Sequence, residues 1–255
     1  MTSAPTRFMI ACAARTGSTM LVRTLRSHPD LVMHGEIWGD TMVGLDGPLA
    51  AACDAEPGRR AALEELRFRD PAAALARFLQ PHGARAVGFK LKFDELVRPQ
   101  WAGLRALLEA DTALGIVFLH RRDLLQRYVS HQVVLRQTGV TVVAAGDAPP
   151  PVRPFAIDVD DLLRDIAQTR ERTRMFEAAF ASHPCLHVDY EALAADPQSA
   201  CARVYRFLGL AQVPVRVATE KILRQPPQAL LLNFDEVRAA LHESGEAAST
   251  GDAAE

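Results

Sequence analysis

The segment Arg15-Thr16-Gly17-Ser18-Thr19 follows a wholly apolar run and precedes a helical pattern. A turn that leads from a strand into a helix gathers backbone N–H groups, hydroxyls and a guanidinium around one point, and such a point suits a phosphate or sulfate group. Gly17 lets the backbone come close to the anion, and Arg15 supplies charge-assisted hydrogen bonds worth about 1.5–3 kcal/mol each. The alternative is an ordinary helix N-cap, for which Ser and Thr are common residues.

The same turn lacks the GxxxxGK(S/T) pattern of the P-loops that hydrolyse nucleotides. No lysine stands where one would reach the β- and γ-phosphates of a triphosphate. An enzyme that uses a differently arranged phosphate ester therefore fits this turn better than an ATP-dependent kinase does.

A second basic segment, His120-Arg121-Arg122-Asp123, follows an apolar run, and Ser130 lies eight residues beyond Arg122. Eight residues span a little over two helical turns, so an arginine at the end of a strand and a serine on the inward face of the next helix can approach one ligand group. A solvated basic helix start has the same residues, and both interpretations stay open at this point.

Short apolar runs without strict alternation predict strands that are covered on both faces. These runs are Phe8 to Ala13, Ala86 to Leu91, Gly115 to His120 and Cys185 to Val188. Besides the helix that follows the first turn, helical patterns cover Arg59 to Arg67, Pro71 to Gln80, Trp101 to Glu109, Arg122 to Gln137, Asp158 to Ala181 and Pro197 to Leu208. Because strands alternate with helices, the sequence predicts an α/β fold of three layers, α/β/α, with a mainly parallel sheet.

Length and composition indicate one folded domain. The 255 residues, 49% of them hydrophobic, are enough for one large core, and we expect a single domain over residues 1–242. Residues 243–255 carry four carboxylates and neither lysine nor arginine, and we expect a disordered acidic tail there. The one long break in the pattern, Gly139 to Pro154, predicts either a domain linker or a loop over an active site.

Charge and cysteine usage exclude several classes of protein. The 29 basic and 31 acidic residues nearly balance, which argues against a nucleic-acid partner. The four cysteines show no CxxC spacing, and Cys12 and Cys185 lie in or beside apolar runs, so we expect reduced thiols in the core and not disulfides or metal ligands. Residues 1–7 form no apolar signal region, and no window reaches the roughly 18 apolar residues that span a bilayer. We therefore expect a cytoplasmic protein.

Together the two basic segments resemble the sulfotransferases that use 3′-phosphoadenosine 5′-phosphosulfate (PAPS). The resemblance is greatest to bacterial carbohydrate sulfotransferases, in particular those that sulfate nodulation-factor chitooligosaccharides, and it extends to trehalose sulfotransferases. It covers most of the chain and includes His28-Pro29, Gly35-Glu36, Val87-Gly88-Phe89-Lys90, the Pro149-Pro150-Pro151 stretch before Pro154-Phe155-Ala156, Tyr190-Glu191, and Ile222-Leu223-Arg224-Gln225 leading to Asn233-Phe234.

The resemblance implies a P-loop-like sulfotransferase fold and a set of residues that bind PAPS. Arg15 to Thr19, with Met20 next to them, correspond to the turn that holds the 5′-phosphosulfate. Arg122 and Ser130 correspond to the residues that hold the 3′-phosphate, with Arg121 as the adjacent candidate. Arg224 and Gln225 fall where related enzymes place a loop over the nucleotide, although a surface helix end is equally compatible with them.

Sulfuryl transfer to a hydroxyl also needs a base, because the hydroxyl proton leaves as the new S–O bond forms. Both a histidine and a glutamate occur in His34-Gly35-Glu36. The resemblance to trehalose sulfotransferases, which use a glutamate just after the first helix, favours Glu36 over His34. Lys90 and Lys92 alternate on a short strand and so point the same way, and the resemblance places Lys90 near the sulfate or the acceptor.

The sequence thus predicts an enzyme that moves a sulfuryl group from PAPS to a small-molecule or carbohydrate hydroxyl, with a homodimer left open. No metal is expected: Cys185-Leu186-His187-Val188-Asp189 looks like an apolar strand that ends in a magnesium-binding aspartate, but the resemblance favours a purely structural role for it. A small-molecule kinase and a non-catalytic protein that binds 3′,5′-adenosine bisphosphate (PAP) are the alternatives.

Overall fold

The structure is a computed structural model of the chain, and it describes residues 6–245. It divides into two compact units. The first comprises the residues up to His120 together with Met175–Val217, and the second comprises Arg121–Arg174 together with the residues from Ala218 onward. Of the predicted tail, Glu243 is the last residue of a helix, and residues 246–255 lie outside the described part of the chain.

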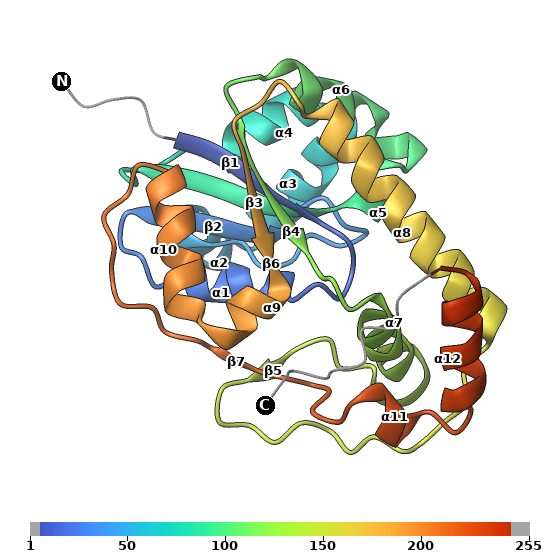
Figure 1. Cartoon of the computed structure of the whole chain (residues 1–255). Coiled ribbons are helices and arrows are strands. Elements are labelled where there is room, and N and C mark those ends of the chain that lie inside the picture. Colours follow the sequence, from blue (N-terminus) through green and yellow to red (C-terminus); the bar gives the residue numbers. More distant parts are fainter. Residues whose placement is uncertain (1–5, 246–255) are drawn as a thin grey trace. The chain divides into compact units, whose positions relative to one another are not determined.

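A five-stranded sheet lies at the centre of the first unit (Figure 1). Its strand order is β2-β3-β1-β4-β6, and every neighbouring pair is parallel, as the sequence predicts. The strands are β1 (Thr6–Cys12), β2 (Leu31–Glu36), β3 (Ala86–Lys92), β4 (Gly115–His120) and β6 (Cys185–Asp189). Since parallel strands end at the same edge of a sheet, the residues that follow them are brought close to one another.

Helices cover both faces of this sheet, so the predicted three-layer α/β/α fold is confirmed. One face packs against α1 (Ser18–Leu25), α9 (Tyr190–Ala195) and α10 (Pro197–Phe207). The other packs against α2 (Gly47–Ala55), α3 (Pro57–Arg69), α4 (Pro71–Phe78), α5 (Phe93–Leu96), the 3-10 turn Pro99–Trp101, α6 (Ala102–Ala110) and the last residues of α8 (Val159–Ala179).

The alternation along β4 shows how one strand serves both cores. Ile116 and Phe118 belong to the core on the α6 side, whereas Val117 and Leu119 belong to the core on the α1 side. All four side chains are at most 1% exposed. A strand buried on both faces therefore carries a continuous apolar run, which is the pattern that reveals it in the sequence.

The second unit has a smaller apolar core and a two-stranded ribbon. Its elements are α7 (Leu124–Val133), the π-helical turn Val134–Thr138, β5 (Val143–Ala144), most of α8, β7 (Thr219–Glu220), α11 (Pro227–Leu230) and α12 (Phe234–Glu243). The side-chain amide of Asn233 both donates to and accepts from the backbone of Ile157, at 2.9 and 3.1 Å. The long break from Gly139 to Pro154 lies wholly within this unit, so it does not connect the two units.

Strand β2 is the one strand of the five-stranded sheet that the sequence pattern does not predict, and helices α2, α9, α11 and α12 are also not predicted. Only its first three residues, Leu31 to Met33, are apolar, and His34, Gly35 and Glu36 follow them, so the apolar run of β2 is too short to predict a buried strand. Its pairing with β3 in the structure identifies it as a strand. The predicted strands and helices are otherwise observed, with ends that shift by a few residues.

The cysteines and the apolar segments agree with the sequence analysis as far as the structure describes them. All four cysteines are free, and three of them are buried as predicted. The prediction of a core thiol is wrong for Cys185, which is exposed at the start of the edge strand β6. No helix between residues 6 and 245 has both the length and the apolar composition needed to cross a bilayer.

Candidate active site

The turn between β1 and α1 has an unusual backbone. Gly17 is the N-cap of α1 and lies in the left-handed region, with φ 78° and ψ 14°. Arg15 also has a positive φ, of 64°, which is uncommon for a residue with a side chain. Left-handed residues of this kind turn successive N–H groups toward one concave point, the arrangement that binds anions.

Gly17 is required here for a second reason, because Tyr190 packs directly against it. A Cβ atom at position 17 would lie 2.3 Å from Cδ2 of Tyr190, far inside van der Waals contact. Tyr190 is the first residue of α9, which follows β6 at the same edge of the sheet. The tyrosine ring thus occupies one side of the turn, and that side is not available to a ligand.

The structure disfavours the ordinary N-cap interpretation of this turn. Among the described residues, no side chain caps the N-terminus of α1, because the N-cap position is a glycine. Ser18 and Thr19 occupy the first helical turn, and Thr16 donates its hydroxyl to the carbonyl of Ala13 at 2.9 Å. The first N–H groups of a helix need acceptors from outside it, and a bound anion supplies them.

Lys90 of β3 connects this turn to the candidate base. Its Nζ donates to the hydroxyl of Thr19 at 3.3 Å and lies 2.6 Å from Oε1 of Glu36. The lysine is only 4% exposed. The turn, which lacks a P-loop lysine of its own, therefore receives a lysine from the neighbouring strand.

A bulge in β2 puts Glu36 opposite Lys90. His34 pairs with Phe89, and the register then shifts so that Glu36, and not Gly35, pairs with Lys90. The N–H of Gly35 donates instead to the carbonyl of Gly44 at 2.7 Å. One extra residue reverses which face the next side chain occupies, so the bulge turns the carboxylate of Glu36 toward the lysines.

Glu36 is held by two lysines, one at each carboxylate oxygen. Lys92 lies 2.8 Å from Oε2, which confirms that Lys90 and Lys92 point the same way. Burial works against the ionised carboxylate, but the charge of Lys90 and the hydrogen bonds from both lysines outweigh it and lower the pKa of Glu36 to about 2. Burial likewise opposes the charge of Lys92, yet Glu95 and Glu36 raise its pKa to about 12.

His34, the other predicted base, has a structural environment. It is 1% exposed, its Nε2 lies 3.0 Å from the carbonyl of Phe78, and its Nδ1 accepts from the N–H of Asp46 at 3.1 Å. A carbonyl only accepts, so the proton resides on Nε2 and both ring nitrogens are engaged. Burial lowers the pKa of His34 to about 4. This geometry favours Glu36 over His34 as the base.

The residues predicted for the 3′-phosphate lie in the second unit, at the start of α7. Asp123 caps this helix by accepting from the N–H of Gln126 at 2.7 Å. Arg121 donates to the side chain of Gln126 at 2.7 Å, whereas Arg122 is exposed on the turn before the helix. Ser130 is buried in the second turn of α7. Both arginines therefore stay candidates for the 3′-phosphate.

Arg224 and Gln225 also lie in the second unit, on the exposed segment between β7 and α11. Arg224 lies 3.3 Å from the carboxylate of Glu220. The first unit therefore contains Arg15 to Met20, His34, Glu36 and Lys90, while Arg121, Arg122, Ser130, Arg224 and Gln225 belong to the second.

Two features of this site are absent from the sequence prediction. The contact of Tyr190 with Gly17 and the bond from Lys90 to Thr19 both join residues more than 70 positions apart. The only signal in the sequence is that each of these residues stands at the end of an apolar run or just after it, where parallel strands place them at one edge.

Comparison with known proteins identifies a family. A model described as "Sulfotransferase family" matches residues 7–214. The search of curated proteins gave no match. Among solved structures, a sulfotransferase from Alicyclobacillus acidocaldarius superposes with a TM-score of 0.50 at 18% identity, covering 95% of this chain and 96% of that one. The sulfotransferase domain of the Synechococcus PCC 7002 olefin synthase gives 0.48 at 18% identity, covering 82% of this chain and 74% of that one. These likenesses concern the fold.

Proposed function

This chain belongs to the sulfotransferase family, and we propose that it transfers the sulfuryl group of PAPS to a hydroxyl group of a carbohydrate or glycolipid. The observation that carries the proposal is the chain of contacts from Thr19 through Lys90 to Glu36. It joins an anion-binding turn to a carboxylate through one buried lysine. An anion site next to a base is what transfer from a phosphosulfate to an alcohol requires.

The turn from Arg15 to Thr19 and the buried Lys90 fit a sulfated 5′-phosphate. The turn offers N–H groups of the first helical turn, two left-handed residues and a guanidinium, and the lysine adds a positive charge of low exposure. PAPS supplies the activated sulfuryl group and a phosphate leaving group. Donors that are already in place stabilise charge on these oxygens without reorganisation, which is how such sites lower a barrier. Met20, next in the helix, completes the proposed set.

Glu36 is the proposed base, and its two lysines explain how its basicity is controlled. With a pKa of about 2 the carboxylate is ionised at neutral pH but is a weak proton acceptor. When Lys90 turns its charge toward the anion, it gives up part of its interaction with Glu36, and the pKa of Glu36 rises. The acceptor proton passes to Glu36 as the new O–S bond forms and the bond from sulfur to the phosphate oxygen breaks.

Arg122 and Ser130 are proposed to hold the 3′-phosphate, with Arg121, Arg224 and Gln225 beside them. An exposed arginine at the start of α7 and a buried hydroxyl further along the same helix support this assignment. The proposal requires no metal ion in the transfer step, places the protein in the cytoplasm and leaves a homodimer open.

The alternatives are a small-molecule kinase and a protein that binds PAP without catalysis. Purified protein would be incubated with a panel of carbohydrates and either PAPS or ATP with Mg²⁺, and nucleotide products would be separated by chromatography. We expect PAP to form only when a carbohydrate is present. ADP formation that depends on the carbohydrate would support the kinase, and PAP binding without any turnover would support the binding protein.

A further inference from the structure

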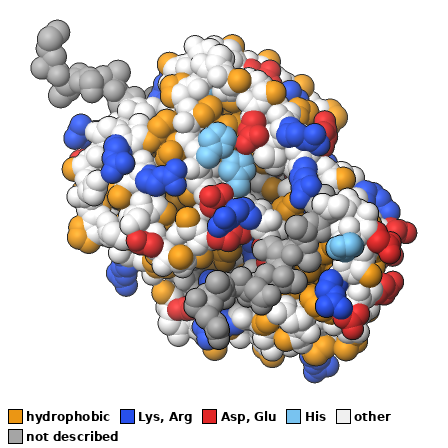
Figure 2. Space-filling view, viewed as in Figure 1, with side chains coloured by type: hydrophobic (Ala, Val, Ile, Leu, Met, Phe, Trp, Pro, Cys, Tyr) orange, Lys and Arg blue, Asp and Glu red, His pale blue; other side chains and the backbone are white. Residues whose placement is uncertain are grey.

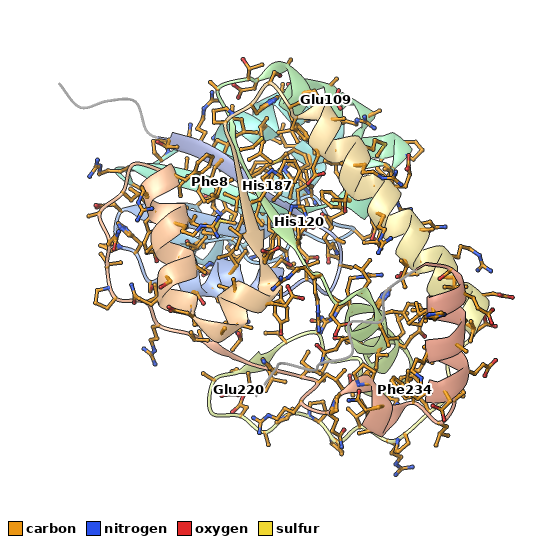
Figure 3. The ribbon with its side chains drawn as sticks, viewed as in Figure 1. Phe8, Glu109, His120, His187, Glu220 and Phe234 are labelled. Atoms are coloured by element: carbon orange, nitrogen blue, oxygen red, sulfur yellow. The ribbon has the colours of Figure 1, made fainter. Side chains whose placement is uncertain are left out.

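Two histidines and a glutamate meet at the surface of the first unit, on the edge strand and its neighbour. Figure 2 shows a pair of histidine side chains together on this face, at the place where Figure 3 labels His120 and His187. His120 ends β4, His187 lies in the middle of β6, and Glu177 lies in the last turn of α8. The proposed sulfuryl transfer uses none of the three.

The sheet and the helix together place these side chains on one face. Phe118 faces the core on the α6 side, so His120, two residues later, points the same way. His187 pairs with Phe118 across the strands and therefore also shares this face. Phe176 of α8 is buried in the same core, and the next residue, Glu177, reaches the two histidines.

Ring stacking holds the two imidazoles in place. Their planes are 9° apart with centroids at 5.2 Å, and the ring of Phe118 stacks on both. The backbone around them is also fixed, since Arg203 donates to the carbonyl of His187 at 3.0 Å. A preformed arrangement of this kind loses little side-chain entropy when it binds a ligand.

The three donor atoms form a triangle of the size that a zinc ion requires. Nε2 of His120 lies 2.9 Å from Nδ1 of His187, and Oε1 of Glu177 lies 3.4 Å from the first nitrogen and 3.5 Å from the second. Zinc bonds of 2.0–2.1 Å in a tetrahedron put neighbouring ligand atoms about 3.3 Å apart. The triangle therefore matches one face of a zinc tetrahedron and leaves the fourth position to water.

The charges around the site favour a cation. Burial, with a smaller contribution from His187, lowers the pKa of His120, while Glu177 and Asp189 oppose that shift. Glu177 supplies a negative charge with 36% of its side chain exposed. In the metal-bound form neither facing nitrogen carries a proton, which assigns the protons to Nδ1 of His120 and Nε2 of His187.

We propose that His120, His187 and Glu177 bind one Zn²⁺ ion. Zinc binds readily to two imidazoles and one carboxylate, whereas harder cations such as Mg²⁺ prefer oxygen ligands. The ion would join β4, β6 and the end of α8, and so stabilise the edge of the sheet. This inference does not rest on the proposed function.

The test measures zinc binding to tag-free protein from which metal has been removed with a chelator. Titration with ZnCl₂ against a chromophoric zinc indicator should show one ion per chain, and MgCl₂ should not compete. His187→Ala should weaken the affinity at least tenfold. Because this side chain is 54% exposed, its removal should leave the fold intact, and far-ultraviolet circular dichroism checks this.

Two control variants separate this site from other zinc ligands. His242→Ala removes an exposed histidine of α12, and Cys185→Ser removes the exposed thiol at the start of β6. Both should bind zinc as the parent does, and zinc should raise the melting temperature of the parent and both controls but not of His187→Ala. The proposal is overturned if the parent and His187→Ala bind zinc equally, or if either control loses the ion. If the two histidines only form a hydrogen bond with each other and hold no ion, the parent and His187→Ala would bind zinc equally.

Discussion

The substitution Glu36→Gln tests the proposed base and its ion pairs in one variant. Glutamine keeps the size of the side chain and one carbonyl oxygen, but it neither accepts a proton nor carries a charge. In the parent, Oε1 and Oε2 lie 2.6 and 2.8 Å from the two lysines, and Lys90 is nearly inaccessible to water. The substitution therefore removes the base and leaves a buried ammonium group without its carboxylate.

The lowered pKa of Glu36 gives the size of the effect that the substitution has on the free energy of unfolding. A change from 4.5 to about 2 favours the folded, ionised form by about 3 kcal/mol at 1.36 kcal/mol per unit. Since the folded pKa is the lower one, this stability is fully present above pH 4.5 and is lost as the pH falls through 2. At pH 7 we expect the free energy of unfolding of Glu36→Gln to be lower by up to about 3 kcal/mol, with the difference from the parent shrinking below pH 4.5.

Urea denaturation at several pH values measures this difference, and turnover is then measured well below the melting temperature. Loss of a general base lowers turnover by roughly 100- to 10,000-fold. PAP affinity should remain within about twofold of the parent, which verifies that the variant is folded. Lys92→Met is the matched control, because it removes the ion pairs of Lys92 with Glu36 and Glu95 but keeps the carboxylate of Glu36. Its turnover should therefore stay far above that of Glu36→Gln.

Near-normal turnover of Glu36→Gln on the true acceptor would refute the assignment of the base. An unchanged free energy of unfolding at pH 7 would refute the reasoning about the ion pairs. The two results are independent, so each part of the account can fail without the other.

Three further predictions concern the nucleotide. Gly17→Ala should weaken PAP binding at least tenfold, because the alanine Cβ would clash with Tyr190 and the alanine would have to keep a positive φ. Calorimetry that shows an unchanged affinity for PAP would argue against the turn as the anion site. Arg122→Ala should weaken PAPS binding about ten- to a hundred-fold, while PAPS without its 3′-phosphate binds the variant and the parent alike; selectivity lost in Arg121→Ala instead would move the assignment by one residue. PAP should raise the melting temperature while ATP with Mg²⁺ changes it little, and equal shifts would count against two separate phosphate sites.

The sequence predicts the fold where strands are buried on both faces. Continuous apolar runs identify β1, β3 and β4, because each is covered by helices on either side. Strand β6 is also predicted from its run, but it lies at an edge of the sheet and exposes Cys185 and His187, so the prediction that it is covered on both faces is wrong. Strand β2 escapes this pattern, since only its first three residues are apolar and His34, Gly35 and Glu36 follow them.

The candidate site is predicted as a set of residues but not as a geometry. The alternation of Lys90 and Lys92 indicates a shared face, and the structure confirms it. The bulge that turns Glu36 toward them depends on the backbone of Gly35 bonding to Gly44, which no local pattern encodes.

The cluster of His120, His187 and Glu177 is even harder to predict from the sequence. Its three residues come from separate segments, and none has the short spacing by which metal ligands are recognised in a sequence. Only the pairing of β4 with β6, together with the packing of α8, brings them within bonding distance of one ion.

We propose that this protein moves a sulfuryl group from PAPS to a hydroxyl. The most direct test incubates the protein with sulfur-labelled PAPS and an extract of metabolites, and follows the products by mass spectrometry with Glu36→Gln as the control. We predict that one class of hydroxyl-bearing carbohydrate or glycolipid gains a single labelled sulfuryl group, with one PAP formed for each group transferred, and that Glu36→Gln gives little of this product. Consumption of PAPS without any labelled acceptor, or equal labelling by the parent and Glu36→Gln, would contradict the account.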